Sequence, residues 1–308
     1  MIRRQNIKFI GLLVLTVFLC GCIKPVNNVE VACKRIAFDM SGGSDLEIYT
    51  ICPDGSGLLK LTNSEGDDLS PVWSPDGARL AFVSTRSGSS QVYLMGEDGS
   101  DQKAVTSDYQ NDDPVWLPDG NHLAVRTTDG SGLWWWRLLN LEDGKISNLT
   151  EPDYDFFFQK QTWSPDGKKI AYMSLVEQQA RNDGSSQIHV KNTDGTDDRA
   201  LTKDIWANIN PIWSPDGKWI AFLSERDGTY NSFALYIIRE DGKKLKRLTD
   251  PVYSESAIYS WSNDGSQIAI ADLFHMGGIM LVDVNTGKSN PLPGLESSQN
   301  ALSPSWQP

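Results

Sequence analysis

Trp73-Ser74-Pro75-Asp76-Gly77 is one copy of a short sequence that recurs along this chain of 308 residues. Four similar copies and a truncated sixth follow it, at residues 116–120, 163–167, 213–217, 261–265 and 303–306. Successive tryptophans lie 43, 47, 50, 48 and 45 residues apart. This is the length of one four-stranded propeller blade, and it is too long for an ankyrin-type or leucine-rich unit. The spacing therefore predicts a repeat protein built of β-propeller blades.

One repeat, residues 69–106, shows how a blade is built. We expect strands at residues 71–73, 79–84 and 91–95, and a fourth strand that ends near Thr106. In the turn after the tryptophan, proline presets φ, aspartate hydrogen-bonds back to the backbone, and glycine takes the left-handed position that closes a hairpin. A second Asp-Gly turn precedes the fourth strand. Each repeat is thus predicted to be a four-stranded antiparallel meander.

The two ends of the repeat region predict how the ring closes. Residues 35–38 match the second strand of the repeat, and residues 304–306 match the first. We therefore expect an all-β fold, a six-bladed β-propeller of four-stranded antiparallel blades, closed by the C-terminal strand completing the first blade. Apolar residues stand on both sides of the predicted strands, so the recurring tryptophan is interpreted as packing between blades. The run Trp134-Trp135-Trp136 is likewise interpreted as core packing rather than as a ligand platform.

The N-terminal residues have the layout of a secretory signal. Three basic residues precede an apolar run at residues 9–19, which is short for a membrane span. The segment Leu19-Cys20-Gly21-Cys22 resembles a bacterial lipobox, whose last cysteine carries lipid. The alternative is an ordinary cleaved signal that happens to contain cysteines. The predicted organisation has three parts: a lipoprotein signal peptide at residues 1–21, a tether at residues 22–32 that is acylated on Cys22, and the propeller at residues 33–308.

Two further cysteines, Cys33 and Cys52, remain in the mature chain. An even pair in an exported protein favours a disulfide, and the alternative is two free buried thiols. Cys33 precedes the second strand of the first blade and Cys52 follows the third. Because these strands are antiparallel neighbours, both cysteines reach the same edge of the sheet, and a disulfide needs Cα atoms closer than about 7 Å. We predict a Cys33–Cys52 disulfide.

The charge of the chain argues against a nucleic-acid partner. There are 28 Lys and Arg residues against 40 Asp and Glu, a formal net charge of −12. No excess of cationic side chains is present to displace counterions from phosphates. The sequence has no G-x-S-x-G elbow, and its three histidines fall in different blades: His122, His189 and His275. We therefore expect no catalytic residues, no metal site built on the histidines and no cofactor.

The variable connections of the repeat indicate where binding residues lie. Strand direction alternates, so the Asp-Gly turns share one face of the propeller and the variable connections share the other, where loops on a rigid scaffold usually bind. Asp68, Asn111 and Asn208 stand five residues before their tryptophans, at the channel mouth, and the aromatic residues Trp206 and Tyr253 lie nearby in the sequence. We predict that these five form a binding site for a cationic peptide segment, a sugar or a metal ion. The alternative interpretation is solvated loops with local Asx turns.

The repeat resembles that of the TolB-like propeller family, whose pattern runs P-x-W-S-P-D-G-x-x-I-A-F, a polar segment, I-Y, D-G and L-T. The resemblance covers residues 35–306 and implies the fold. Similar repeats occur in propellers attached to prolyl-oligopeptidase-type enzymes and in an oligogalacturonate lyase family. The resemblance is therefore less specific for function than it is for fold. The type member carries an N-terminal α/β domain for which we expect no room in this chain. In such propellers the position of Asp68, Asn111 and Asn208 often holds Asn or Asp near the axis.

These features predict a lipid-anchored protein of the cell envelope that faces the periplasm or the extracellular side. We expect it to be a non-catalytic binding or scaffold module for an envelope protein, a peptide or a glycan, held to the membrane by its N-terminal lipid. The alternative is a carbohydrate-active or other hydrolytic enzyme with its site at the channel mouth. A third interpretation is a mainly structural envelope protein with no small ligand.

Overall fold

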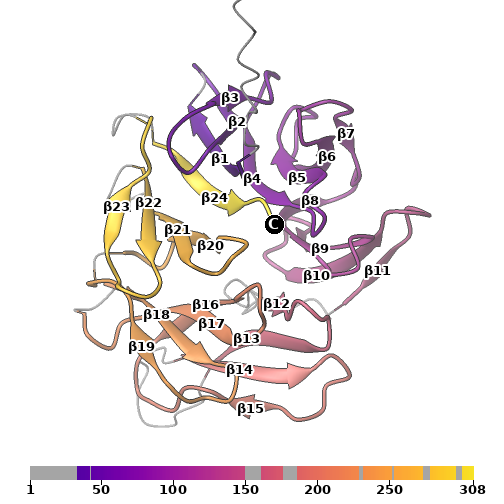
Figure 1. The fold of residues 1–308 in the computed structure, drawn as a ribbon. Helices are drawn as coiled ribbons and strands as arrows, with labels where there is room; N and C mark the ends of the chain where they lie inside the picture. The colour runs from indigo at the N-terminus through magenta and orange to yellow at the C-terminus, as the bar shows by residue number, and fades with distance from the viewer. Residues whose placement is uncertain are drawn as a thin grey trace, which may run out of the picture. The chain divides into compact units, whose positions relative to one another are not determined.

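The computed structural model describes residues 33–308 apart from residues 42, 150–160, 176–185, 229–231, 252, 273–277 and 296–299. The described residues form β-strands and no helix, and the strands make six separate four-stranded sheets (Figure 1). Neighbouring strands within every sheet are antiparallel, and the sheets are arranged around a central axis as the blades of a propeller. The predicted fold is confirmed.

Each blade is named here by its strands, with the innermost strand first. Blade 1 contains β24 (Leu302–Trp306), β1 (Ile36–Ser41), β2 (Leu46–Ile51) and β3 (Leu59–Lys60), and blade 2 contains β4 (Asp68–Trp73), β5 (Arg79–Ser84), β6 (Gln91–Gly96) and β7 (Lys103–Ala104). Blade 3 contains β8 (Gln110–Trp116), β9 (His122–Thr128), β10 (Trp134–Asn140) and β11 (Ile146–Asn148), and blade 4 contains β12 (Gln161–Trp163), β13 (Lys169–Leu175), β14 (Ser186–Asn192) and β15 (Arg199–Ala200). Blade 5 contains β16 (Asn208–Trp213), β17 (Trp219–Ser224), β18 (Ala234–Arg239) and β19 (Lys246–Arg247), and blade 6 contains β20 (Ile258–Trp261), β21 (Gln267–Ala271), β22 (Ile279–Asp283) and β23 (Ser289–Pro291).

Blade 1 closes the ring as predicted. Strand β24, from the C-terminal end of the chain, pairs with β1 in the register Ile36↔Trp306 and Ala37↔Ser305. A sheet that would otherwise expose the edge of β1 is thereby completed on its inner side, as a closed propeller requires.

The Ser-Pro-Asp-Gly turn owes its shape to the side chains that the repeat preserves. Ser74 Oγ donates a hydrogen bond to Asp76 Oδ1 (2.5 Å) and accepts one from the backbone N of Arg79 (2.9 Å). Gly77 has φ 70°, in the left-handed region that glycine adopts without steric cost. The hydrogen bond from Ser74 is the largest cause of the lowered pKa of Asp76. The turn is therefore an ordered network, which explains why the motif recurs with few changes.

The recurring tryptophans pack between blades. Trp73 is 6% exposed and lies in one apolar cluster with Ala37 and Ile48 of blade 1 and Phe82 of blade 2. Trp116 Nε1 donates to the backbone O of Val72 in the preceding blade (3.1 Å). The interpretation of these tryptophans as packing residues is confirmed.

In the part of the chain that the structure describes, four innermost strands carry a bulge that the repeat pattern did not reveal. Their pairing register shifts three residues before the tryptophan, where a non-glycine residue has positive φ: Ser70 (51°), Asp113 (45°), Asn210 (54°) and Ser303 (50°). In blade 2, the backbone N of Ser70 donates to Asp39 Oδ1 (3.0 Å) in the neighbouring blade. Such bulges bend a strand locally, and here they shape the wall of the axial channel.

Candidate functional site

The innermost strands of the six blades surround a cavity of about 540 Å³ on the propeller axis. The wall runs from the middle of these strands to the tight turns. Its lining includes the recurring tryptophans and the apolar residues beside them, of which Val72, Val115 and Ile212 are partly buried. A ring of turn residues lines the cavity at its tight-turn end: Pro75, Pro118, Pro165, Pro215, Asn263 and Pro308.

The sequence carries a signal for this cavity that the prediction did not use. In the pattern P-x-W-S-P, residue x follows the alternation of a strand and therefore faces away from the buried tryptophan. Val72 and Ile212 occupy this position and line the channel. The cavity thus lies toward the end of the channel that carries the tight turns, whereas the binding residues were predicted at the opposite end.

The predicted residues Asp68, Asn111 and Asn208 lie at the starts of the innermost strands β4, β8 and β16, and each is completely buried. Asp68 Oδ2 lies 2.9 Å from Nη2 of Arg86 in an ion pair. Asn208 Oδ1 accepts a hydrogen bond from Arg226 Nη2 (3.1 Å). The polar groups of Asp68 and Asn208 are therefore bound to arginines inside the protein.

Asn111 is held in a network of its own. Its Oδ1 accepts a hydrogen bond from Thr127 Oγ1 (2.9 Å) and its Nδ2 donates one to Gln91 Oε1 (3.1 Å). Arg137 Nη2 lies 3.4 Å from the same Oδ1. All three predicted positions thus contact an arginine.

Arg86 and Arg226 are equivalent residues of blades 2 and 5. Each stands 13 residues after its tryptophan in a Ser-x-Arg sequence, and each Nε donates to the serine Oγ, at 2.8 Å for Ser84 and 3.1 Å for Ser224. The guanidinium groups lie over aromatic rings: Cζ of Arg86 is 4.8 Å from the centre of the Tyr93 ring, and Cζ of Arg226 is 5.0 Å from the centre of the Tyr236 ring. This Ser-x-Arg sequence is the signal that could have identified the arginines.

The two predicted aromatic contacts differ in exposure. Trp206 is 39% exposed, and its backbone N donates to Asp204 Oδ1 (3.1 Å). Tyr253 is 2% exposed, and burial together with the nearby Asp272 raises its pKa to about 12. Of the five predicted binding side chains, Trp206 alone offers a ligand a large surface. Binding through these residues stays a prediction.

The described cysteines form a disulfide, and the described histidines lie apart from one another. Cys33 and Cys52 form a disulfide with Cα atoms 5.8 Å apart, whereas Cys22 and His275 lie outside the described residues. His122 Nδ1 lies 2.7 Å from Asp119 and His189 Nδ1 lies 3.0 Å from Asp198, on different blades. Within the described part of the chain, no group of three His, Cys, Asp or Glu residues is arranged to hold a metal ion, and no helix is long and apolar enough to cross a membrane.

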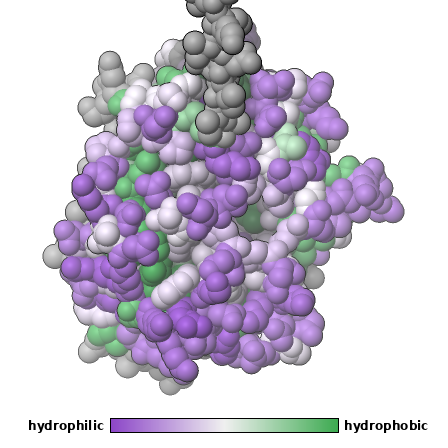
Figure 2. All heavy atoms as spheres, viewed as in Figure 1, coloured by the Kyte–Doolittle hydropathy of each residue, from purple (hydrophilic) through white to green (hydrophobic). Residues whose placement is uncertain are grey.

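The surface around the blades is mostly polar. On the face shown in Figure 2, hydrophilic side chains cover most of the propeller, and hydrophobic ones appear in narrow patches. A partner that used this face would therefore find its apolar contacts in recesses rather than on a broad apolar surface.

The sequence matches a known family along nearly all of the described region. Residues 30–181 and 163–308 match the family described as TolB beta propeller domain. A protein TolB homolog of Chlorobium luteolum is 46% identical over 61 residues, which are 20% of this chain and 14% of that protein. The Tol-Pal system protein TolB of Bordetella pertussis is 34% identical over 130 residues, which are 42% of this chain and 29% of that protein. The matches span less than a third of the length of these relatives.

Solved structures share the fold. The crystal structure of TolB from Acinetobacter baumannii superposes with a TM-score of 0.74 at 21% identity, covering 89% of this chain and 67% of that one. A putative TolB from Agrobacterium tumefaciens gives a TM-score of 0.62 at 22% identity, covering 85% of this chain and 89% of that one.

Proposed function

The chain belongs to the TolB β-propeller family, and on that premise we propose that it is a non-catalytic protein-binding or scaffold module of the cell envelope. Support for the cellular setting comes from the relative named as a Tol-Pal system protein. The partner we propose is an envelope protein that inserts a peptide segment into the axial channel.

One observation carries this proposal: the 540 Å³ axial cavity is walled by the innermost strands of all six blades. Its volume lies within the about 300–1,000 Å³ of typical binding pockets. Because the surrounding blades are closed on one another, the wall is rigid, and a bound segment would lose freedom without requiring the protein to reorganise. The net charge of −12 favours a partner segment that carries basic residues beside its apolar anchor.

The residues that line the axial cavity give less support to the alternative of a hydrolytic enzyme. Glycosidases use a pair of carboxylic acids across the substrate. Among the described residues, Asp113 is the one carboxylate that lines the axial cavity, and it lies 3.0 Å from Arg126 in an ion pair.

The proposal includes the N-terminal lipid. Acylation of Cys22 would hold the propeller at the membrane through a tether at residues 22–32, because lipid chains in combination anchor a protein stably. A Cys22→Ser variant should then move from the membrane fraction to the soluble fraction and lose acyl label. Persistence of label and of membrane binding in this variant would refute the anchor.

The binding proposal is tested by affinity capture from the protein's own envelope, followed by mass spectrometry and titration of the captured partner. Ile212→Glu places a charge in the apolar cavity wall and should abolish capture. The matched control is Leu245→Glu, because Leu245 is 42% exposed and does not line the cavity. Both variants must unfold at temperatures close to that of the wild type. Equal capture by both folded variants would move the partner site away from the channel.

A further inference from the structure

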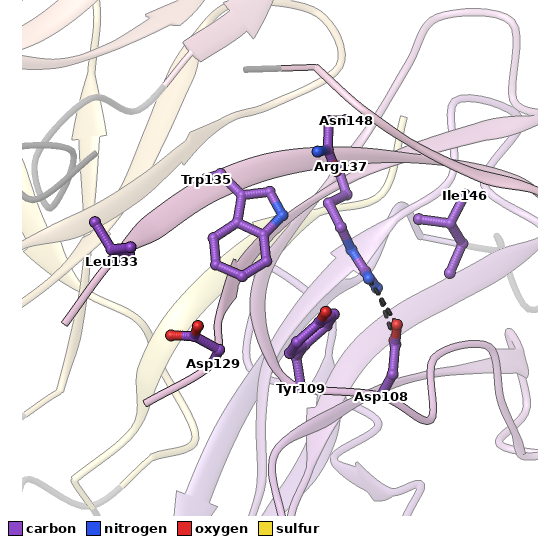
Figure 3. Close-up of a pocket in the computed structure, with 8 residues that line it drawn as sticks. All are labelled: Asp108, Tyr109, Asp129, Leu133, Trp135, Arg137, Ile146 and Asn148. Atoms are coloured by element: carbon purple, nitrogen blue, oxygen red, sulfur yellow. Dashed lines mark hydrogen bonds and ion pairs between the residues drawn. The ribbon is translucent and has the colours of Figure 1, made fainter. Parts of the chain in front are cut away.

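Blade 3 carries a second hollow, of about 520 Å³, away from the axial channel. Eight of the described residues, from four segments, line it (Figure 3): Asp108, Tyr109, Asp129, Leu133, Trp135, Arg137, Ile146 and Asn148. Two come from the connection into β8, one from the loop after β9, three from β10 and its approach, and two from β11. We call this hollow the blade 3 pocket.

Two aromatic rings shape the pocket. Tyr109 is 50% exposed, and its ring meets the indole of Trp135 edge-on, with centroids 5.4 Å apart and an interplanar angle of 79°. The backbone of Tyr109 has φ 54°, a left-handed conformation that is uncommon for a bulky residue. Gln91 Nε2 donates to the backbone O of Tyr109 (2.8 Å) and holds the bend. The exposed ring is therefore presented by a fixed backbone.

A charge pair forms the polar wall of the pocket. Arg137 donates from Nη1 and Nη2 to the two carboxylate oxygens of Asp108, both at 2.8 Å. These hydrogen bonds are the largest cause of the lowered pKa of Asp108. Arg137 is 5% exposed and its guanidinium lies 5.4 Å from the centre of the Tyr109 ring. The pair is thus a rigid, electrically balanced array of planar hydrogen-bonding groups.

Trp135 distinguishes blade 3 from blades 2 and 4. It pairs with Thr127, and the equivalent pairs in blades 2 and 4 are Gln91↔Ser84 and Gln187↔Ser174. Those two glutamines donate to the connection that enters the next blade, as Gln187 Nε2 does to the backbone O of Asp204 (2.8 Å). Blade 3 has Trp135 at this position, an aromatic side chain that lines the pocket (Figure 3), is 6% exposed in keeping with the predicted core packing of this run, and supports the exposed Tyr109 ring.

We propose that the blade 3 pocket binds one neutral pyranose unit of a glycan. The exposed face of Tyr109, bounded by Trp135, offers a negative π surface to the C–H groups of a sugar ring. The fixed Asp108–Arg137 pair, with Asp129 and Asn148, offers donors and acceptors to its hydroxyl groups.

The charges of the pocket exclude other ligand classes. Among the described lining residues, the two carboxylates of Asp108 and Asp129 outnumber the arginine, Arg137, and this negative balance disfavours an anionic sugar or a phosphate. A cationic peptide side chain would have to share Asp108 with Arg137, which already donates to both oxygens of that carboxylate. A neutral ring with many hydroxyl groups therefore fits best.

The test is calorimetric titration of the folded propeller with two neutral probes, cellotetraose and chitotetraose. We expect at least one to bind with a dissociation constant of about 1 mM or tighter. Trp135→Gln installs the residue that blades 2 and 4 carry, so the blade should fold while affinity falls at least tenfold. Tyr109→Ala should have the same effect, whereas Tyr109→Phe retains the ring and should retain binding. Leu245→Ala, on blade 5, is the matched surface control.

Three results would overturn the proposal. The first is that neither saccharide binds at concentrations up to about 10 mM, because any affinity below this limit is too weak for specific recognition. The second is saccharide binding that folded Trp135→Gln leaves unchanged, which would place the sugar elsewhere. The third is binding of tetralysine without saccharide, lost in Trp135→Gln, which would assign the pocket to cationic peptides.

Discussion

Asp68 and Arg86 stand 18 positions apart in the sequence and join the start of β4 to the segment after β5, with Arg86 Nη2 2.9 Å from Asp68 Oδ2. The carboxylate is completely buried, and the arginine side chain is 21% exposed. In blade 5 the equivalent Arg226 contacts the neutral Asn208 and forms its ion pair with Asp204, whose Oδ2 lies 2.6 Å from Nη2. Each of the two arginines therefore has a carboxylate partner, but the two carboxylates come from different positions of the repeat.

The burial of the Asp68 carboxylate predicts the outcome of substituting Arg86. Arg86→Met should lower the free energy of unfolding by about 3 kcal/mol, because it leaves the Asp68 charge buried without its partner. Asp68→Asn places the amide of Asn208 at this position and should cost about 1 kcal/mol, since the amide oxygen still accepts from Arg86, whose side chain is 21% exposed. The double variant should be more stable than Arg86→Met alone. Urea unfolding measures all three, and a double variant less stable than Arg86→Met would contradict the role assigned to the buried charge.

The fold followed closely from the sequence because one local network repeats. The turn that Ser74, Asp76 and Gly77 form needs only residues close in sequence, so its recurrence located the blades and the closure. The bulge at Asp113 has no such signature, because a positive φ there depends on strands that meet across the fold. Likewise, Asn111 was placed correctly at the start of an innermost strand, but its burial depends on Arg137, 26 residues away.

Asp39 links stability to pH. Burial raises the pKa of this carboxyl above its usual 3.8, outweighing the hydrogen bonds from Ser303 and from the backbone of Ser70. The folded protein therefore binds a proton more tightly than the unfolded chain, and the contribution of Asp39 to stability falls as pH rises through its folded pKa. Asp39→Asn removes this ionisation. Relative to the wild type, the variant should gain stability most at neutral pH, and the difference should shrink as the pH falls toward 4.

Chemical unfolding of both proteins across this pH range measures the difference directly. Other carboxylates titrate in both proteins, so subtraction isolates the contribution of Asp39. A difference that grows on acidification would mean that Asp39 is stabilised as an anion in the folded state.

The Cys33–Cys52 disulfide closes a short loop, with a sequence separation of 19. Restricting a loop of this length in the unfolded chain stabilises the folded state by about 3 kcal/mol. The variant with both Cys33→Ser and Cys52→Ser should therefore unfold at lower urea concentration than the wild type. Added reductant should lower the stability of the wild type and leave the variant unchanged. Labelling of both cysteines by a maleimide in the native exported protein would show instead that the bond is absent there.

The two aromatic residues predicted at the channel mouth should respond differently to truncation, because one is exposed and the other is buried. Tyr253 is 2% exposed and packs with Phe233 and Tyr259 in one apolar cluster. Tyr253→Ala should therefore destabilise the propeller by about 3 kcal/mol or more, through the cavity that it leaves.

Trp206 is 39% exposed and precedes an innermost strand, so Trp206→Ala should leave the unfolding transition nearly unchanged. If the envelope partner extends along the channel to this end, the truncation should weaken its binding by about 1 kcal/mol or more, as loss of an interface aromatic does. Titration of the captured partner against Trp206→Ala and Ile212→Glu compares the two ends of the channel on the same scale. Loss of affinity in both variants is expected for a segment that spans the channel. Loss in Ile212→Glu alone would confine the partner to the cavity beside the tight turns and refute the predicted contact at Trp206.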